Sequence, residues 1–356
     1  MSTRAASGKI PPEVFEATIA PLLGAARPEV LIGPRTGADC AVVRTGAGRV
    51  LVFSTDPLSL VPALGAERSA RLACHLLASD VWTSGIPPAW VTVCFNLPPD
   101  TSDETLAIYW RAMGDEWTRL GVAVVAGHTG RYEGCGLTII GAATVIGVGD
   151  EVRYLTPAMA SPGDRLIVTK SCAYETTAIA AQLFPKRLAA RLGDDEAAMA
   201  RARQMIDSVS VVADCVAILR IGVRDRGVSA LHDATEGGVL GGLIELARVC
   251  GHDLRVSRAA LPLSSEARAA CEVFGIDPYW SLSEGTLIAA VRPQHAKAAL
   301  AALTDEGIVA AEVGEVVDGK GMLWLTEPDG KVVKLTHPEP DPYWEAYARA
   351  VRERWE

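Results

Sequence analysis

The chain has 356 residues, of which 49% are hydrophobic and 22% are charged, and this profile predicts a folded protein of about two domains rather than a disordered one. Its net charge is −9, from 34 lysines and arginines against 43 aspartates and glutamates. A negative surface argues against general binding of nucleic acid and against docking on anionic lipid. An anionic substrate would need a metal ion or a local basic site.

We expect helices in the first half over 11–26, 66–80 and Thr101–Leu120. Strands are predicted over Ala41–Val43, Arg49–Ser54, Ala89–Leu97, Val122–Ala126 and Leu137–Gly147. The turn Thr45–Gly48 joins the first two strands and predicts a hairpin.

A second unit begins near residue 155. Its predicted strands are Arg165–Thr169, Val228–Leu231, Thr286–Val291, Val309–Val317 and Gly321–Leu325. Its predicted helices are several segments up to about residue 221, then Gly237–Cys250, Gln294–Glu306 and an amphipathic tail over Asp341–Trp355. The sequence therefore predicts a chain that mixes helices with strands in both halves.

Eight cysteines are scattered along the chain, with no CxxC pair and no zinc-ligand spacing, and they predict free thiols in a reducing compartment. The first nine residues lack the apolar core of a signal peptide. The longest uncharged stretch, 81–99, contains Gly85 and the pair Pro87-Pro88, so we do not expect it to span a membrane. These features predict a cytoplasmic protein.

Four polar residues of the first half, Asp39, Asp56, Asp80 and His128, share one context: the end of an apolar strand or the inside of an apolar helix. A charge in such a place is costly unless it is paired or binds a metal ion. Carboxylates that converge from several strand ends would form an oxygen site suited to Mg²⁺ and phosphate. The alternative is a turn or capping role for each aspartate.

The second half offers three further segments with polar candidates. His232–Val239 reads HDATEGGV between a strand and a helix, where Asp233 or Thr235 can cap the helix and Gly237-Gly238 lets backbone N–H groups approach an anion. A plain helix cap is the alternative. Lys170 follows a strand and can meet a phosphate or lie at the surface, and Glu284 precedes a strand and can cap it or approach a metal ion or nucleotide.

Seven stretches in order resemble the superfamily of AIR synthase, thiamine-monophosphate kinase, selenophosphate synthetase and the hydrogenase-maturation carbamoyl dehydratase HypE. The stretches are GADCAVV (37–43), STD (54–56), ASDVWTSGIPP (78–88), AGHT (126–129), VTKSCAYETTAIAA (168–181), HDATEGGVLGGLIELA (232–247) and IDPYWSLSEGTLIAAV (276–291). The last two are most similar to HypE and to AIR-synthase-related proteins. The resemblance covers residues 33–320.

The resemblance implies an α+β fold of two AIR synthase-like domains. Residues 1–154 would bind ATP and pair their sheet with that of a second copy in a homodimer, and residues 155–356 would form the second domain with a helical tail. The implied reaction is phosphoryl transfer from ATP, with Mg²⁺, to an amide, phosphate or similar oxygen of a small molecule or a carrier-bound group.

The resemblance also implies roles for particular residues. The metal ligands would be Asp39, Asp56, Asp80 and Asp233, and the catalytic residues Asp80, His128 and Asp233. The nucleotide would contact Asp39, Thr55, Asp56, Gly127, Thr129, Lys170, Glu175, Thr235, Gly237, Gly238 and Glu284.

Three positions depart from the family pattern. Ala38 stands where the family often has the first of two aspartates, and His128 stands where it has a carboxylate. HypE carries its carbamoyl group on a C-terminal cysteine, whereas the last cysteine here is Cys271, so we expect a separate acceptor molecule. Two alternatives follow: a non-catalytic nucleotide-binding assembly or regulatory protein, and a kinase resembling thiamine-monophosphate kinase.

Overall fold

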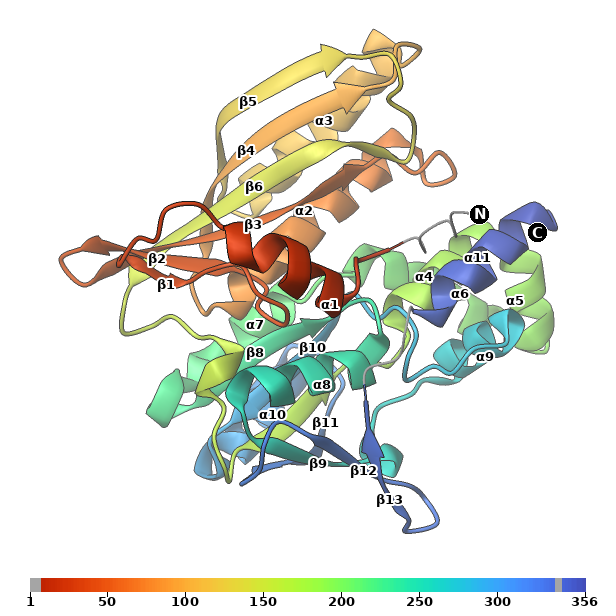
Figure 1. Ribbon diagram of the computed structural model, residues 1–356. Coiled ribbons are helices and arrows are strands. Elements are labelled where there is room, and N and C mark those ends of the chain that lie inside the picture. Colours follow the sequence, from red (N-terminus) through yellow and green to blue (C-terminus); the bar gives the residue numbers. More distant parts are fainter. Residues whose placement is uncertain (1–7, 337–340) are drawn as a thin grey trace. The chain divides into compact units, whose positions relative to one another are not determined.

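The computed structural model describes residues 8–336 and 341–356, and its chain divides into two compact units (Figure 1). The N-unit comprises Arg27–Gly33 and Asp39–Tyr154. The C-unit comprises the described residues among 8–26, 34–38, 155–336 and 341–356. Each unit contains one sheet with helices packed on it, which confirms the predicted α+β class.

The N-unit is built on a six-stranded sheet in the order β1-β2-β3-β6-β4-β5. These strands are β1 Val30–Ile32, β2 Ala41–Gly46, β3 Arg49–Ser59, β4 Pro88–Leu97, β5 Ala123–Arg131 and β6 Ile139–Asp150. Two helices, α2 (Gly65–Thr83) and α3 (Asp103–Arg119), lie on one face of the sheet (Figure 1). β5 pairs in parallel with β4 and forms an edge of the sheet.

Side chains of β3 alternate between the two faces of this sheet, because successive residues of a strand point to opposite sides. Val50, Val52, Ser54 and Leu58 are buried on one side, while Thr55 on the other side is exposed. Asp56 shares the phase of the buried set, so it lies on the α2 side of the strand. This alternation places polar groups of β3 against α2.

The C-unit is built on a seven-stranded sheet in the order β13-β12-β9-β11-β7-β10-β8. Its strands are β7 Arg165–Thr169, β8 Val228–Ala234, β9 Asp253–Ser257, β10 Thr286–Val291, β11 Ala310–Val317, β12 Leu323–Thr326 and β13 Val332–Leu335. Helix α8 (Gly238–Cys250) packs its apolar residues on one face to form a continuous core. Helices α7 (Val212–Ile218) and α10 (Ala296–Asp305) pack against each other, and α10 contacts β7 and β11.

A group of helices forms a second core within the C-unit. The group consists of α4 (Tyr174–Leu183), α5 (Pro185–Arg191), α6 (Glu196–Gln204), α9 (Ser265–Phe274) and α11 (Pro342–Arg352). Aromatic rings join them: Phe184 packs edge-on against Phe274, and Tyr343 of α11 is buried against Phe274. The tail helix is therefore part of this core, and most of the expected amphipathic tail is confirmed as a helix.

Several predicted elements differ from the structure. The helix expected over 11–26 is a short helical run, Pro12–Leu22, with no buried residue, and its last turn contains Pro21, which has no N–H for the helical ladder. The strands β3, β5 and β8 are longer than predicted, so Asp56, His128, His232 and Asp233 lie inside strands rather than beyond their ends. The sequence did not predict β1, β9, β13 or α9.

The strands β7 and β10 have the predicted bounds, and the β2–β3 hairpin is confirmed.

Within the described residues, no helix combines the length and apolar character needed to cross a membrane.

Candidate active site

One edge of the C-unit sheet collects three of the predicted segments. β10 runs antiparallel to both β7 and β8, with Ile288 opposite Val168 and Thr286 opposite Ala234. The start of β10 therefore lies at the same edge as the ends of β7 and β8. This register brings the segments that carry Lys170, Asp233 and Glu284 to one place, although they are far apart in sequence.

Hydrogen bonds lock the turn before β10 against the other two strands. Ser283 N–H donates to Thr235 O at 3.2 Å, and Ser283 Oγ accepts from Ala173 N–H at 2.8 Å. Thr286 Oγ1 donates to Ser171 O at 2.8 Å. Glu284, between these tethered residues, is buried.

The loop Thr235–Gly238 leads from β8 into α8 and needs its glycines. Gly237 has φ +83° and Gly238 has φ +65°, in the left-handed region that favours glycine. A Cβ on Gly238 would come within 2.7 Å of the carbonyl oxygens of Tyr279 and Ser281. Gly237 N–H donates to Asp341 Oδ2 at 2.7 Å, and Gly238 N–H donates to Thr235 O at 3.1 Å, so both amides have acceptors within the chain.

Charged side chains surround this loop. Lys9 donates from its backbone N–H to Glu236 Oε2 at 2.8 Å, and its Nζ donates to Thr235 Oγ1 at 2.9 Å. Glu175 lies half-buried in the first turn of α4. Burial, and then the negative charges of Asp341 and Glu236, raise the pKa of Glu175 to about 8, so this carboxyl holds a proton at neutral pH.

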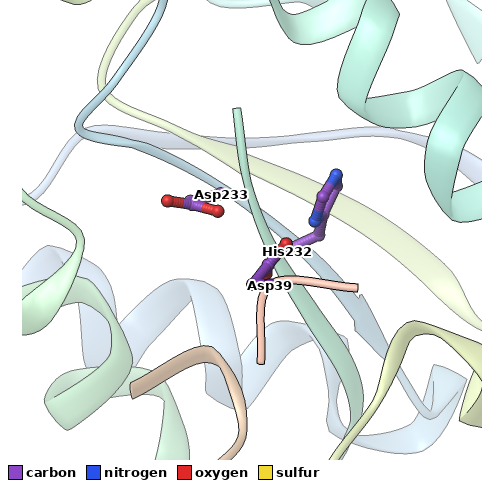
Figure 2. A group of neighbouring side chains, drawn as sticks. All are labelled: Asp39, His232 and Asp233. Carbon is purple, nitrogen blue, oxygen red and sulfur yellow. The ribbon is translucent and has the colours of Figure 1, made fainter. Parts of the chain in front are cut away.

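His232 and Asp233 are consecutive residues of β8 and are both buried. Their side chains extend to different sides of the strand (Figure 2). His232 Nε2 lies 3.0 Å from Glu245 Oε2 on α8. A ring nitrogen of His232 and a carboxylate oxygen of Asp233 lie within 4.8 Å of each other, a separation at which both can reach one metal ion.

Lys170, which the sequence assigned to the nucleotide, has three acceptors inside the C-unit. Its Nζ donates to Ser210 O at 2.7 Å, to Asp214 Oδ2 at 2.5 Å and to Gly285 O at 2.7 Å. An ammonium group has three donors, so these bonds use all of them. The role of Lys170 in nucleotide binding stays a prediction.

The N-unit brings two of the predicted metal ligands together. Ser54 Oγ donates to Asp80 Oδ2 at 2.5 Å and lies 3.4 Å from Asp56 Oδ2. β3 supplies Ser54 and Asp56, and α2 supplies Asp80. Two carboxylates that converge on one hydroxyl form an all-oxygen donor set, which fits the coordination preference of Mg²⁺.

The other predicted residues of the N-unit are arranged differently. Asp39 lies two residues before Ala41, which is opposite Phe53, so the chain enters β2 beside the Ser54–Asp56 part of β3. Thr55 faces the other side of the sheet, where its Oγ1 lies 2.8 Å from Thr144 Oγ1. Thr55 therefore lies on the opposite face of the sheet from Asp56 and Asp80.

His128, Gly127 and Thr129 lie on β5, which the sheet order separates from β3 by β6 and β4, roughly 14 Å across the sheet. His128 Nε2 bonds to Tyr132 OH at 2.6 Å on the exposed edge strand. A Cβ on Gly127 would come within 2.5 Å of Val93 O, so close packing of the two strands by itself explains a glycine at this position. Within the N-unit, the structure does not bring His128 to Asp56 and Asp80.

The sequence analysis missed four residues that contact these sites: Lys9, Ser54, Asp214 and Asp341. Asp341 precedes Pro342, a sequence typical of a helix start, and its Oδ1 indeed accepts from Tyr343 N–H at 2.8 Å. Nothing local in the sequence indicates its second bond to Gly237. Asp214 stands in the apolar run VVADCVAIL (211–219), where an unpaired charge would be costly, and this sequence signal could have suggested a basic partner.

Comparison with known proteins gives two family matches. The model of the AIR synthase related protein N-terminal domain matches residues 37–148, and that of the C-terminal domain matches residues 161–323. Carbamoyl dehydratase HypE of Escherichia coli (strain K12) is 30% identical over 306 residues, which cover 83% of this chain and 84% of that protein.

Solved structures agree with these matches. The crystal structure of E. coli HypE has a TM-score of 0.70 at 27% identity and covers 89% of this chain and 94% of that one. A HypE–HypF complex shares the fold, with a TM-score of 0.69 at 21% identity over 91% of this chain and 99% of that one. HypE in complex with ATP also shares it, with a TM-score of 0.61 at 22% identity over 95% of this chain and 98% of that one. A thiamine-monophosphate kinase, AaThiL complexed with AMPPCP and TMP, has the same fold, with a TM-score of 0.68 at 18% identity over 94% of this chain and 99% of that one.

Proposed function

This chain belongs to the AIR synthase related protein family, and from that premise we propose that it is an ATP-dependent enzyme of the HypE type. It would transfer a phosphoryl group from ATP to the oxygen of a carbamoyl group, so that the oxygen can leave and the group is dehydrated. The 30% identity to carbamoyl dehydratase HypE over most of both chains supports this reaction class.

The observation that carries the proposal is the common sheet edge in the C-unit. There the ends of β7 and β8 and the start of β10 bring together Asp233, the Thr235–Gly238 loop and Glu284. Phosphoryl transfer needs positioning and charge stabilisation more than covalent chemistry, and groups held by three strand ends can provide both. A buried carboxylate such as Glu284 is suited to orient or accept a proton from a polar substrate group.

We propose that Mg²⁺ is held by Asp56 and Asp80, with Asp39 and Asp233 as further ligands. The ion would supply positive charge that neutralises the phosphate oxygens. The bond from Ser54 to Asp80 fixes the orientation of that carboxylate before any ion binds. Thr55, Gly127, Thr129 and His128 remain proposed nucleotide or catalytic residues; His128 is supported only by its place in the resembling motif.

We propose that the acceptor of the chemistry is a separate molecule, either a small molecule or a group on a carrier protein. The eight cysteines, all in the described part of the chain, form no disulfide, and Cys74, Cys172, Cys215 and Cys271 are buried, which does not suit a thiol that must carry a group into a site. Free thiols also support the proposed cytoplasmic location.

We also propose a homodimer formed by the N-unit sheet. β5 has one unpaired edge, and apolar side chains on it and on β4 are exposed: Trp90 by 37%, Val124 by 39% and Val125 by 55%. A second copy of the chain is the proposed occupant, because the family resemblance implies sheet pairing there. Such a face left in water would also be an aggregation hazard.

Substrate-stimulated release of ADP is the test of the proposed reaction. The purified protein with ATP and Mg²⁺ is given carbamoyl thioesters, small amides, phosphorylated vitamin precursors or amines in turn. We expect ADP release above background with the carbamoyl compound, and a higher melting temperature with Mg²⁺-ATP because the ligand binds only the folded state.

The same experiment separates the alternatives. ADP release with a phosphorylated vitamin precursor alone would favour a kinase, to which the thiamine-monophosphate kinase fold is similar. Tight ATP binding without turnover for any compound would favour a non-catalytic nucleotide-binding protein, the alternative that Ala38 and His128 support. No binding at millimolar ATP would refute the proposal.

A further inference from the structure

The most completely buried charged contact near the C-unit site joins Lys170 to Asp214. Asp214 has no exposed surface, and one of its oxygens, Oδ2, accepts from Lys170 Nζ at 2.5 Å. The other oxygen, Oδ1, is buried and has no hydrogen-bond partner in the described part of the chain. The carboxylate therefore depends on Lys170 for its neutralisation.

Breaking this pair would be unfavourable, because each partner would become an unpaired charge in the interior. Lys170 could reach a phosphate only by giving up Asp214 and two carbonyl oxygens together. Its backbone is also held in the left-handed region, at φ +55°, which a non-glycine residue adopts only where the surroundings fix it. Lys170 thus behaves as a fixed connector.

This connector joins three segments of the C-unit. Lys170 directly follows β7, Asp214 is in the first turn of α7 and Ser210 lies just before it, and Gly285 belongs to the turn before β10. Glu284 precedes Gly285, and its other neighbour, Ser283, is bonded to Thr235 O and to Ala173 N–H. The main chain is therefore tied on both sides of Glu284, and Lys170 provides the tie on one side.

We propose that Asp214 is a positioning residue of the site: acting through Lys170, it holds the Glu284–Gly285 turn in place at the edge formed by β7, β8 and β10. Asp214 itself touches neither nucleotide nor substrate. The claim that this turn serves catalysis rests on the function proposed above. The claim that Asp214 and Lys170 hold the turn in place is independent of that function.

The holding of the turn is tested by amide hydrogen exchange read by mass spectrometry over residues 281–287. The variants are Asp214→Asn and, as a matched control, Asp164→Asn. Asp164 is also buried and paired, with Arg292 at 2.8 Å, but it precedes β7 at the opposite end of that strand. We expect exchange at least tenfold faster in Asp214→Asn and within twofold of the parent in Asp164→Asn.

A double variant, Lys170→Met with Asp214→Leu, covers the case in which Asp214→Asn does not fold. It removes both charges and leaves no unpaired ion, so it should recover the melting temperature of the parent. In the double variant the Glu284–Gly285 turn lacks the bond from Lys170, so we expect amide exchange over residues 281–287 to be as fast as in Asp214→Asn. Its kcat for ATP consumption should fall at least tenfold, while KM for ATP stays within threefold.

Three results overturn the proposal. The first is exchange of the turn at the parent's rate in the double variant, and the second is an equal loosening of the turn by Asp164→Asn. The third is recovery of kcat together with the melting temperature, which would leave the pair a purely structural role. A parent protein that consumes no ATP with any substrate refutes the proposed function instead. In that case the exchange rates still decide whether Asp214 holds the turn.

Discussion

Replacing Glu175 by glutamine removes a carboxyl near the glycine loop whose pKa is raised far enough to keep its proton at neutral pH. The pKa of Glu175 is raised to about 8 by burial and by the charges of Asp341 and Glu236. In the unfolded chain the same group titrates near 4.5. The protonated carboxyl therefore contributes stability that is complete below about pH 4.5 and is lost as the pH rises to about 8.

The size of the effect follows from proton linkage. Between the two pKa values the unfolded chain has released the proton while the native chain retains it, so the free energy of unfolding falls by about 1.4 kcal/mol per pH unit. From pH 6 to pH 8 this amounts to ~3 kcal/mol at most. Glu175 is only half-buried, and contact with solvent reduces the effect to about 1–2 kcal/mol.

Guanidinium unfolding of the parent and of Glu175→Gln at pH 6 and pH 8 measures this difference. Comparison of the two proteins cancels the other titrating groups, and far-UV circular dichroism follows the unfolding. We expect the parent to lose about 1–2 kcal/mol more than the variant between the two pH values. Equal losses in both proteins would show that Glu175 is ionised in the native state and would refute the reasoning.

Three further predictions concern the N-unit and the thiols. Asp80→Asn should weaken Mg²⁺-ATP binding about tenfold in a calorimetric titration, with an unchanged circular-dichroism spectrum, because an amide is a poorer ligand than a carboxylate; equal affinity would make Asp80 a structural residue. If the proposed dimer forms, light scattering should give a dimer mass for the parent with and without reductant and a monomer mass for Val125→Lys; a parent of monomer mass contradicts this prediction. The intact mass of the protein should not change after incubation with ATP, carbamoyl phosphate and a HypE carbamoyltransferase partner. Burial raises the pKa of Cys271 to about 12, and buried thiols of this kind stay protonated and unreactive. A carbamoyl or cyano adduct would restore the HypE mechanism.

Local sequence predicted those elements whose whole signal lies within them. β7 and β10 are short apolar runs bounded by polar or glycine residues, and both have the predicted bounds. The segment 11–26 has apolar residues at helical spacing too, yet Val14 and Ile19 are exposed. Periodicity indicates a face that could be buried, but only a packing partner buries it.

The site was harder to predict because its contacts are not local. The sequence predicted that β8 ends before His232 and Asp233, because a polar pair is not typical of a buried strand. In the structure His232 bonds to Glu245 on α8, and the strand continues through both residues. Asp214 lies 44 residues from Lys170, and Asp341 lies 104 residues from Gly237. Such pairs depend on the register of strands and the packing of helices, which no single motif contains.

The first described residues and the start of the tail helix both bond to the same loop: Lys9 to Thr235 across 226 residues, and Asp341 to Gly237 across 104. A purification tag, a fusion partner or a proteolytic cut at either end therefore acts directly on the loop at the start of α8. Removing α11 with Asp341 would leave Gly237 N–H without its carboxylate acceptor. A ligand that accepts a hydrogen bond from that N–H must displace the Asp341 carboxylate, so protease sensitivity of α11 should report on occupancy of the loop.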